Sequence, residues 1–284
     1  MIIDAHVHLF PNEAVAHTVL DDFQRRWGVG YISLGTPELH RSEMQRAGVD
    51  AAVMLSFAPD NQLKNNNFWT TAITRPGKNR PAAFPNLIPF VSISPNMKGR
   101  PLLDELEHKR TWGMRGLKIH PIAQGFAPDD PRMFPVYTWL VQQDLPITSH
   151  CGINISAGSD THLAHPDRWR SILQAFPALR LTLAHMGGGF WEETLRLCAE
   201  FPQVMLDTAV AICGNPGVIK DRNWLDDAQA LEMIRTVGAA RVMFGSDYPW
   251  FDPAEDLARL RSLPLQAAEL RQILGENAAR WLKM

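Results

Sequence analysis

The stretch IIDAHVH, residues 2–8, contains the first of eight short apolar runs that recur along the chain. Runs of this length that are apolar on both faces are typical of parallel strands covered by helices on both sides. We predict strands over residues 2–6, 51–57, 87–93, 114–120, 146–150, 180–185, 203–208 and 241–247.

The segments between these runs carry helix signals. Proline stands at positions 37, 131 and 166, where it would suit the first turn of a helix. Helices are predicted from 37 to about 47, over 102–109 and 131–143, from 166 to about 176, and over 191–201 and 225–237. Two connections, 9–37 and 209–225, are longer than usual, and we expect long loops there that build the mouth of a site.

Eight strands that alternate with helices predict an α/β fold, a single (β/α)8 barrel over residues 1–284. Such a barrel needs roughly 250 residues. An open, doubly wound sheet is the alternative. Its dinucleotide-binding form requires Gly-x-Gly-x-x-Gly after a strand, and the glycines at 187–189 have the wrong spacing.

Composition argues against several classes of partner. The 28 basic and 30 acidic residues give a net charge of −2, and no basic cluster indicates binding to nucleic acid or to an anionic membrane. No apolar stretch approaches the ~20 residues of a membrane span, and no secretory signal is recognised. The three cysteines are too irregularly spaced for a disulfide framework. We therefore expect a cytoplasmic protein with a small-molecule substrate, and a homodimer stays open.

Histidines gather at the ends of the predicted strands. His6 and His8 lie two residues apart, so their side chains would share one face of the first strand and could present two imidazoles to Zn2+. Alone, such a pair is also compatible with two partly buried polar residues. However, other predicted strands end in His120, His150, His185 and Asp247. A barrel brings all these ends to one mouth, so the joint pattern predicts a metal site.

Five motifs carry a resemblance to a known family: Asp4-Ala-His-Val-His8, Gly116-Leu-Lys-Ile-His-Pro121, His185-Met-Gly-Gly188, Phe244-Gly-Ser-Asp-Tyr-Pro249 and Gly275-Glu-Asn-Ala-Ala-Arg280. In this combination the sequence resembles the amidohydrolase superfamily from residue 2 to about residue 282. The resemblance is to its amidohydrolase-related branch, which includes aminocarboxymuconate-semialdehyde decarboxylase-like proteins and small lactone hydrolases. The motifs are specific to the branch but not to a substrate.

The resemblance implies one divalent metal ion, for which we expect Zn2+. Its ligands would be His6, His8, His150 and Asp247. Three imidazoles and a carboxylate suit Zn2+, which lowers the pKa of its bound water to about 7. His185 and Asp247 would be the catalytic residues that move protons beside that water.

Four further residues are expected to bind substrate: Lys118, His120, Arg222 and Trp250. Lys118 is the ambiguous one, because a fourth-strand lysine is carbamylated and bridges two metals in binuclear members of the superfamily. We favour the alternative, an inward cation that pairs with Asp207 or binds an anionic substrate. His120 would line the mouth or hydrogen-bond a loop.

Two reactions are compatible with this set of residues. The first is hydrolysis of a lactone, ester or amide bond in a small carboxylate-bearing substrate, with His120 and His185 near the metal-activated water. The alternative is non-oxidative decarboxylation of an aromatic or muconate-type acid, for which Trp191, Trp224 and Trp250 would form an apolar slot. A non-enzymatic binding protein is disfavoured because all four expected ligands are present.

Overall fold

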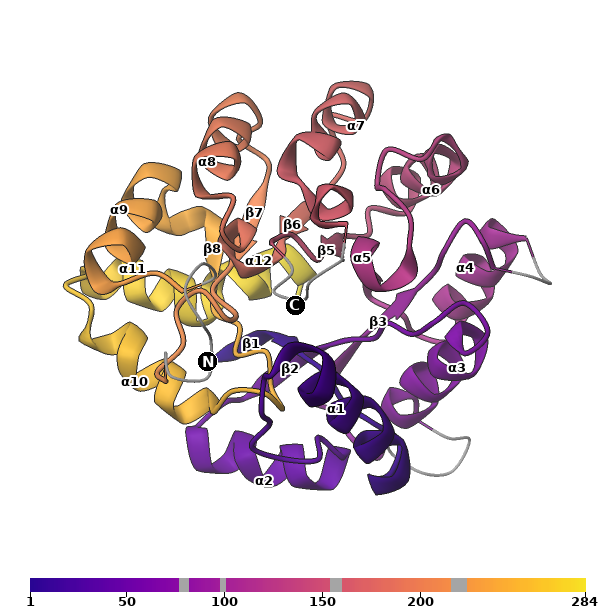
Figure 1. The fold of residues 1–284 in the computed structure, drawn as a ribbon, viewed down its shortest axis with the longest axis horizontal. Coiled ribbons are helices and arrows are strands. Elements are labelled where there is room, and N and C mark those ends of the chain that lie inside the picture. The colour runs from indigo at the N-terminus through magenta and orange to yellow at the C-terminus, as the bar shows by residue number, and fades with distance from the viewer. Residues whose placement is uncertain (77–81, 98–100, 154–159, 216–223) are drawn as a thin grey trace.

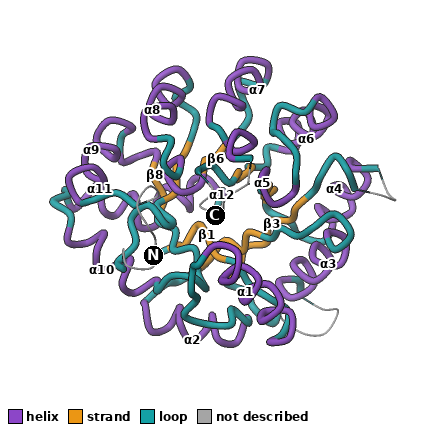
Figure 2. The backbone as a smooth tube through the Cα atoms, in the orientation of Figure 1, coloured by secondary structure: helices purple, strands orange, loops and turns teal. Residues whose placement is uncertain are grey.

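The computed structural model describes residues 1–76, 82–97, 101–153, 160–215 and 224–284. Eight parallel strands follow one another in chain order in one sheet, and the helices surround it (Figures 1 and 2). The strands are β1 Ile3–Val7, β2 Ala51–Leu55, β3 Leu87–Ser92, β4 Gly116–Ile119, β5 Ile147–Ser149, β6 Leu181–Leu183, β7 Met205–Asp207 and β8 Val242–Met243. Each overlaps one of the eight predicted runs, so the predicted barrel is confirmed.

The barrel is closed by contacts between β1 and the segment that follows β8. Ala5 N donates a hydrogen bond of 2.7 Å to Phe244 O, and Asp247 N donates one of 2.9 Å to His6 O. One residue further along, Val7 and Tyr248 form a parallel bridge. An open sheet would leave these backbone groups at its two edges, so the doubly wound alternative is wrong.

Helices lie between successive strands and after β8. They are α1 Glu13–Trp27, α2 Pro37–Ala47, α3 Leu63–Thr74, α4 Leu102–Thr111, α5 Pro121–Gln124, α6 Phe134–Gln143, α7 Arg170–Ala175, α8 Trp191–Glu200, α9 Asp227–Val237, α10 Pro253–Ser262, α11 Ala267–Arg271 and α12 Asn277–Leu282. Shorter helical turns are η1 Pro131–Met133, η2 Thr161–Ala164, η3 Pro166–Trp169, η4 Ala184–Gly187, η6 Ala239–Arg241 and the π-helical η7 Gln272–Glu276. The six predicted helices correspond to α2, α4, η1 with α6, η3 with α7, α8 and α9.

The predicted loop over 9–37 is wrong, because this connection contains α1. Asn12 caps the helix by accepting a hydrogen bond of 3.0 Å from Val15 N, and Gly28 ends it in a left-handed conformation with φ 68°. Ala16 and Leu20 are fully buried on its inner face. Part of the other long connection, residues 216–223, lies outside the described residues.

Every strand residue is buried, as expected for a parallel sheet covered by helices. Polar side chains are therefore conspicuous where the strands carry them, as at Asp4, His6, Lys118 and Asp207. Because burying such groups is costly unless each has a partner, their contacts identify the site. Within the described ranges, no helix is both long and apolar enough to cross a membrane.

Candidate active site

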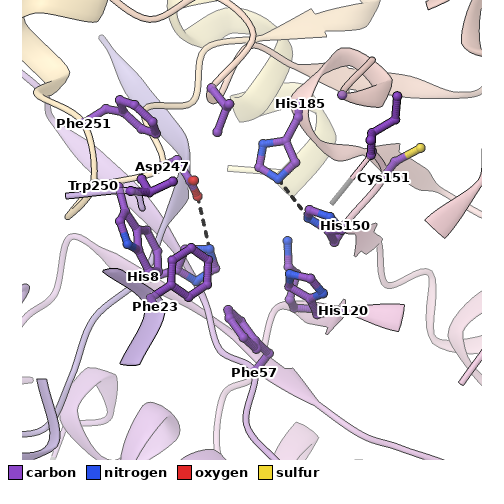
Figure 3. A pocket seen from close by; sticks show the side chains of 16 residues that line it. His8, Phe23, Phe57, His120, His150, Cys151, His185, Asp247, Trp250 and Phe251 are labelled. Atoms are coloured by element: carbon purple, nitrogen blue, oxygen red, sulfur yellow. Dashed lines mark hydrogen bonds and ion pairs between the residues drawn. The ribbon is translucent and has the colours of Figure 1, made fainter. Parts of the chain in front are cut away.

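A pocket opens at the carboxyl ends of the strands. Figure 3 shows His8 and Asp247 on one side of it and His185, His150 and His120 on the other. Its remaining wall is largely apolar and aromatic, with Phe23, Phe57, Val210, Trp250, Phe251 and Ile153 among the lining residues. The strand-end residues that the sequence predicted to lie close together thus surround one cavity.

Three side-chain atoms converge at the wall formed by β1 and the segment after β8. His6 Nε2 and His8 Nε2 are 3.1 Å apart, and each is 3.3 Å from Asp247 Oδ1. His6 Nδ1 faces Asp207 Oδ2 at 2.9 Å, and His8 Nδ1 faces the Leu55 carbonyl oxygen at 2.7 Å. Because these oxygens accept, both rings carry their proton on Nδ1, and both Nε2 lone pairs point toward the Asp247 carboxylate.

This arrangement fits a divalent metal ion. Asp247 Oδ1 is buried and has no hydrogen-bond partner among the described residues. Lone pairs facing one another in a buried site repel unless a cation lies among them. Donors that share one tetrahedral Zn2+ at about 2.0–2.1 Å stand roughly 3.3 Å from one another, which agrees with the three separations. The donor set of two imidazoles and a carboxylate is also one that such ions bind.

Asp4 stabilises the wall formed by β1 and the segment after β8. Its carboxylate accepts hydrogen bonds from Ser246 Oγ at 2.5 Å, Ser246 N at 3.0 Å and His6 N at 3.1 Å. Burial raises the pKa of Asp4 to about 7. Asp4 therefore ties β1 to the segment after β8 and holds Asp247 beside His6. Sequence reasoning gave Asp4 no role, although a charged residue inside an apolar run was a usable signal.

His185 and His150 are hydrogen-bonded on the opposite wall. His185 Nδ1 donates to the Ala209 carbonyl oxygen at 3.1 Å, and its Nε2 lies 3.1 Å from His150 Nδ1. Burial lowers the pKa of His185 to about 4, so the ring is neutral at pH 7. His150 Nδ1 must then be the donor to His185, which leaves His150 Nε2 with its lone pair.

His150 does not join the three converging atoms. In the part of the chain that the structure describes, two groups of potential ligands have their atoms within 4.8 Å of one another, namely His6, His8 and Asp247, and His6, His185 and Asp207. The expected role of His150 as a ligand therefore stays a prediction. Its ring stacks on His120 with 3.9 Å between centroids and 9° between planes.

Lys118 is fully buried, and its Nζ lies 3.4 Å from His6 Nε2. Burial lowers its pKa to about 8, although the charges of Asp207 and Asp247 oppose this shift. Lys118 and Asp207 form no ion pair within 4.0 Å, and the Asp207 oxygens instead contact His6 Nδ1 and His185 N. Burial also raises the pKa of Asp207 to about 7.

The other predicted substrate-binding residues differ in their positions. His120 lines the pocket and also caps α5, since its Nδ1 accepts a hydrogen bond of 3.3 Å from Ala123 N. Trp250 lines the pocket, with its ring 5.4 Å from that of His8. Arg222 lies outside the described residues. Trp191 and Trp224 are not among the lining residues.

Aromatic residues that sequence reasoning missed complete the wall. Phe57 lies 5.1 Å from the His8 ring and 4.8 Å from the His120 ring, measured between centroids. Phe23 comes from α1, in the segment predicted to be a loop, and its ring is 4.8 Å from that of Trp250. Phe57 ended a predicted strand run, and that position was the available signal.

Comparisons with known proteins agree with this fold. The model of the amidohydrolase family matches residues 3–284. An uncharacterised TIM-barrel protein from Bordetella bronchiseptica is 21% identical, with 99% of this chain and 98% of that chain covered and a TM-score of 0.75. No curated protein matches the sequence.

Two solved structures with described activities share the fold at lower identity. A dihydroxybenzoic acid decarboxylase from Polaromonas, with bound manganese and the inhibitor 2-nitroresorcinol, is 16% identical, with 99% and 96% of the chains covered and a TM-score of 0.73. A 4-oxalomesaconate hydratase from Rhodopseudomonas palustris is 18% identical, with 100% and 96% covered and a TM-score of 0.68. At such identities the similarity shows the fold alone.

Proposed function

Because this chain belongs to the amidohydrolase family, we propose that it is an enzyme that uses one divalent metal ion to hydrolyse a small, flat, carboxylate-bearing substrate at a lactone, ester or amide bond. The convergence of His6 Nε2, His8 Nε2 and Asp247 Oδ1 carries this proposal. His150 would be the fourth ligand. Zn2+ is the expected ion, and Mn2+ is the alternative that the Polaromonas relative suggests.

The walls of the pocket support the choice of substrate. Phe57 and Trp250 flank the His8 ring and would hold an apolar, planar body. Lys118 supplies a buried positive charge beside His6, where it would attract the carboxylate. When bound, the metal supplies Lewis acidity that polarises a carbonyl group.

The protonation states favour hydrolysis, which needs a proton acceptor. His185 is neutral at pH 7, and it faces the pocket. Burial alone would raise the pKa of Asp247, but the net shift is downward, with the positive charge of Lys118 among its causes, so Asp247 is ionised. One of these two groups would take a proton from water as the water oxygen bonds to the carbonyl carbon. The same proton would then go to the departing oxygen or nitrogen as its bond to that carbon breaks.

Decarboxylation is the second candidate, and the aromatic walls favour it as much as they favour a flat lactone. In this reaction the carbon that loses CO2 must receive a proton. Lys118, whose pKa is lowered to about 8, carries a proton at pH 7 and would be the source. The Polaromonas decarboxylase of the same fold adds weight to this alternative.

The two reactions differ in their products. To distinguish them, we would load the protein with Zn2+ or with Mn2+ in separate samples. Each sample would be incubated in 18O-labelled water with a panel of lactones, amides and aromatic or muconate-type acids. Hydrolysis predicts an acid that carries one labelled oxygen and no release of CO2. Stoichiometric CO2 without ring opening would overturn the hydrolase proposal in favour of decarboxylation. The His8→Ala variant is the control, since any turnover it retains comes from a contaminant.

A further inference from the structure

Asp207, the last residue of β7, contacts the two groups on which the proposed function depends. Its Oδ2 lies 2.9 Å from His6 Nδ1, and its Oδ1 accepts a hydrogen bond of 2.8 Å from His185 N. The side chain is fully buried. One carboxylate thus bridges the first strand and the turn that carries His185.

The contact with His6 determines which ring nitrogen is free. A carboxylate oxygen accepts, so the His6 proton stays on Nδ1 and the Nε2 lone pair faces His8 and Asp247. Without this acceptor, the ring could place its proton on Nε2, where it would block the binding of a cation. Partners of this kind commonly set the tautomer and orientation of metal-binding histidines.

The hydrogen bond between Asp207 and His185 stabilises an unfavourable backbone conformation. His185 and Met186 have φ values of 60° and 51°, in the left-handed region that is unfavourable for residues other than glycine. The hydrogen bond from His185 N to Asp207 Oδ1 holds the first of these two left-handed residues. The His185 ring is thereby directed so that its Nδ1 reaches Ala209 O and its Nε2 reaches His150.

We propose that Asp207 is a positioning residue that prepares His6 for metal binding and at the same time fixes the direction of His185. The proposal rests on the metal site of the proposed function. Asp207 itself is not among the residues that line the pocket. Its effect on reaction and metal would pass through its two histidine partners.

The variant Asp207→Asn tests this with little change in volume. An amide has one oxygen, so it can accept only one of the two N–H groups and presents its own NH2 to the other. The matched control is Asp256→Asn. Asp256 is also a buried aspartate, its Oδ1 accepts a hydrogen bond from Gly214 N, and it lies outside the site.

Two measurements are needed, and neither requires a substrate. Titration with Co2+, followed by its visible absorption, gives affinity and ligand geometry, and 15N-labelled histidine gives the tautomer of His6 by NMR. We expect Asp207→Asn to bind Co2+ about 10–100-fold more weakly, with an altered spectrum and a proton on His6 Nε2. Asp256→Asn should match the wild type in both.

Unchanged affinity and an unchanged His6 tautomer in Asp207→Asn would overturn the proposal. An NMR spectrum of the wild-type protein that places the His6 proton on Nε2 would also overturn it. That measurement does not depend on whether the Asp207→Asn variant folds. If the wild type does not bind Co2+ at all, the proposed metal site fails, whereas the tautomer measurement still tests the role of Asp207.

Discussion

At the scale of single residues, the imidazoles of the site are oriented by acceptors that lie behind them. Leu55 O, Asp207 Oδ2 and Ala209 O each engage the Nδ1 atom of a different histidine. Burying neutral imidazoles requires such partners, and each partner also determines which nitrogen faces the pocket. The lone pairs are therefore already directed before any ligand arrives.

A pair of substitutions separates metal binding from proton transfer. His8→Ala removes one of three converging donors, so we expect it to lose both the metal and the activity. His185→Asn should keep about one ion per chain and lower kcat by roughly 100-fold or more, the usual scale for a lost acid or base. Elemental analysis and steady-state kinetics measure the two effects.

The exposed His17 on α1 provides the control, and His17→Asn should leave both quantities unchanged. Loss of the metal from the His185→Asn protein would identify His185 as a ligand. Two ions per wild-type chain would instead support a bridging role for Lys118.

Some residues of the site could be predicted from the sequence, whereas the contacts that hold them in place could not. His6, His8 and Asp247 could be predicted because they stand at strand ends, and strand ends meet in a barrel. The pairings of Asp4 with Ser246 and of Asp207 with His6 could not, because they join residues 242 and 201 positions apart. Such contacts depend on register and barrel closure, which local sequence patterns do not specify.

At the scale of secondary structure, the strands were easier to predict than α1. A strand buried on both faces is a continuous apolar run, whatever it packs against. Helix α1 instead packs beside the segment after β8, where Ala16 and Leu20 form a cluster with Trp250 and Phe251. Its Phe23 lines the pocket. The helix is an addition to the repeating pattern of strands and helices, so the regular alternation gave no reason to expect it.

Helix α2 should make the stability of the protein sensitive to acid. His40 is 2% exposed, its ring lies 5.0 Å from that of Tyr248, and burial lowers its pKa to about 4. In the unfolded chain the pKa is about 6.5, so between these values the unfolded state binds more protons than the folded state. Stability is therefore full above pH 6.5 and decreases as the pH falls toward 4.

We expect His40 alone to remove about 2 kcal/mol of unfolding free energy between pH 7 and pH 5. Urea unfolding at both pH values would measure this loss in the wild type and in His40→Phe, which cannot take up the proton. The other buried histidines are common to both proteins, so the difference isolates His40. An equal loss in the two proteins would contradict the prediction.

At the scale of the whole molecule, metal binding should raise stability through mass action. An ion that binds only the folded protein adds RT ln(1 + [M]/Kd), about 2.7 kcal/mol at a free concentration of 100 times Kd. Calorimetry with and without Zn2+ should show a higher Tm for the metal-loaded wild type. His8→Ala should show no shift, and a shift of equal size in that variant would place the stabilising ion elsewhere.

The closure of the barrel between β1 and β8 has a consequence for biosynthesis. His6 and His8 leave the ribosome long before Asp247, whose backbone N donates the hydrogen bond to His6 O. A bound ion would act as a reversible cross-link between these distant segments, and chain cross-links become more stabilising as the enclosed loop lengthens. A nascent chain that lacks its last strand has only part of the binding site, so tight metal uptake would mark the moment at which the barrel closes.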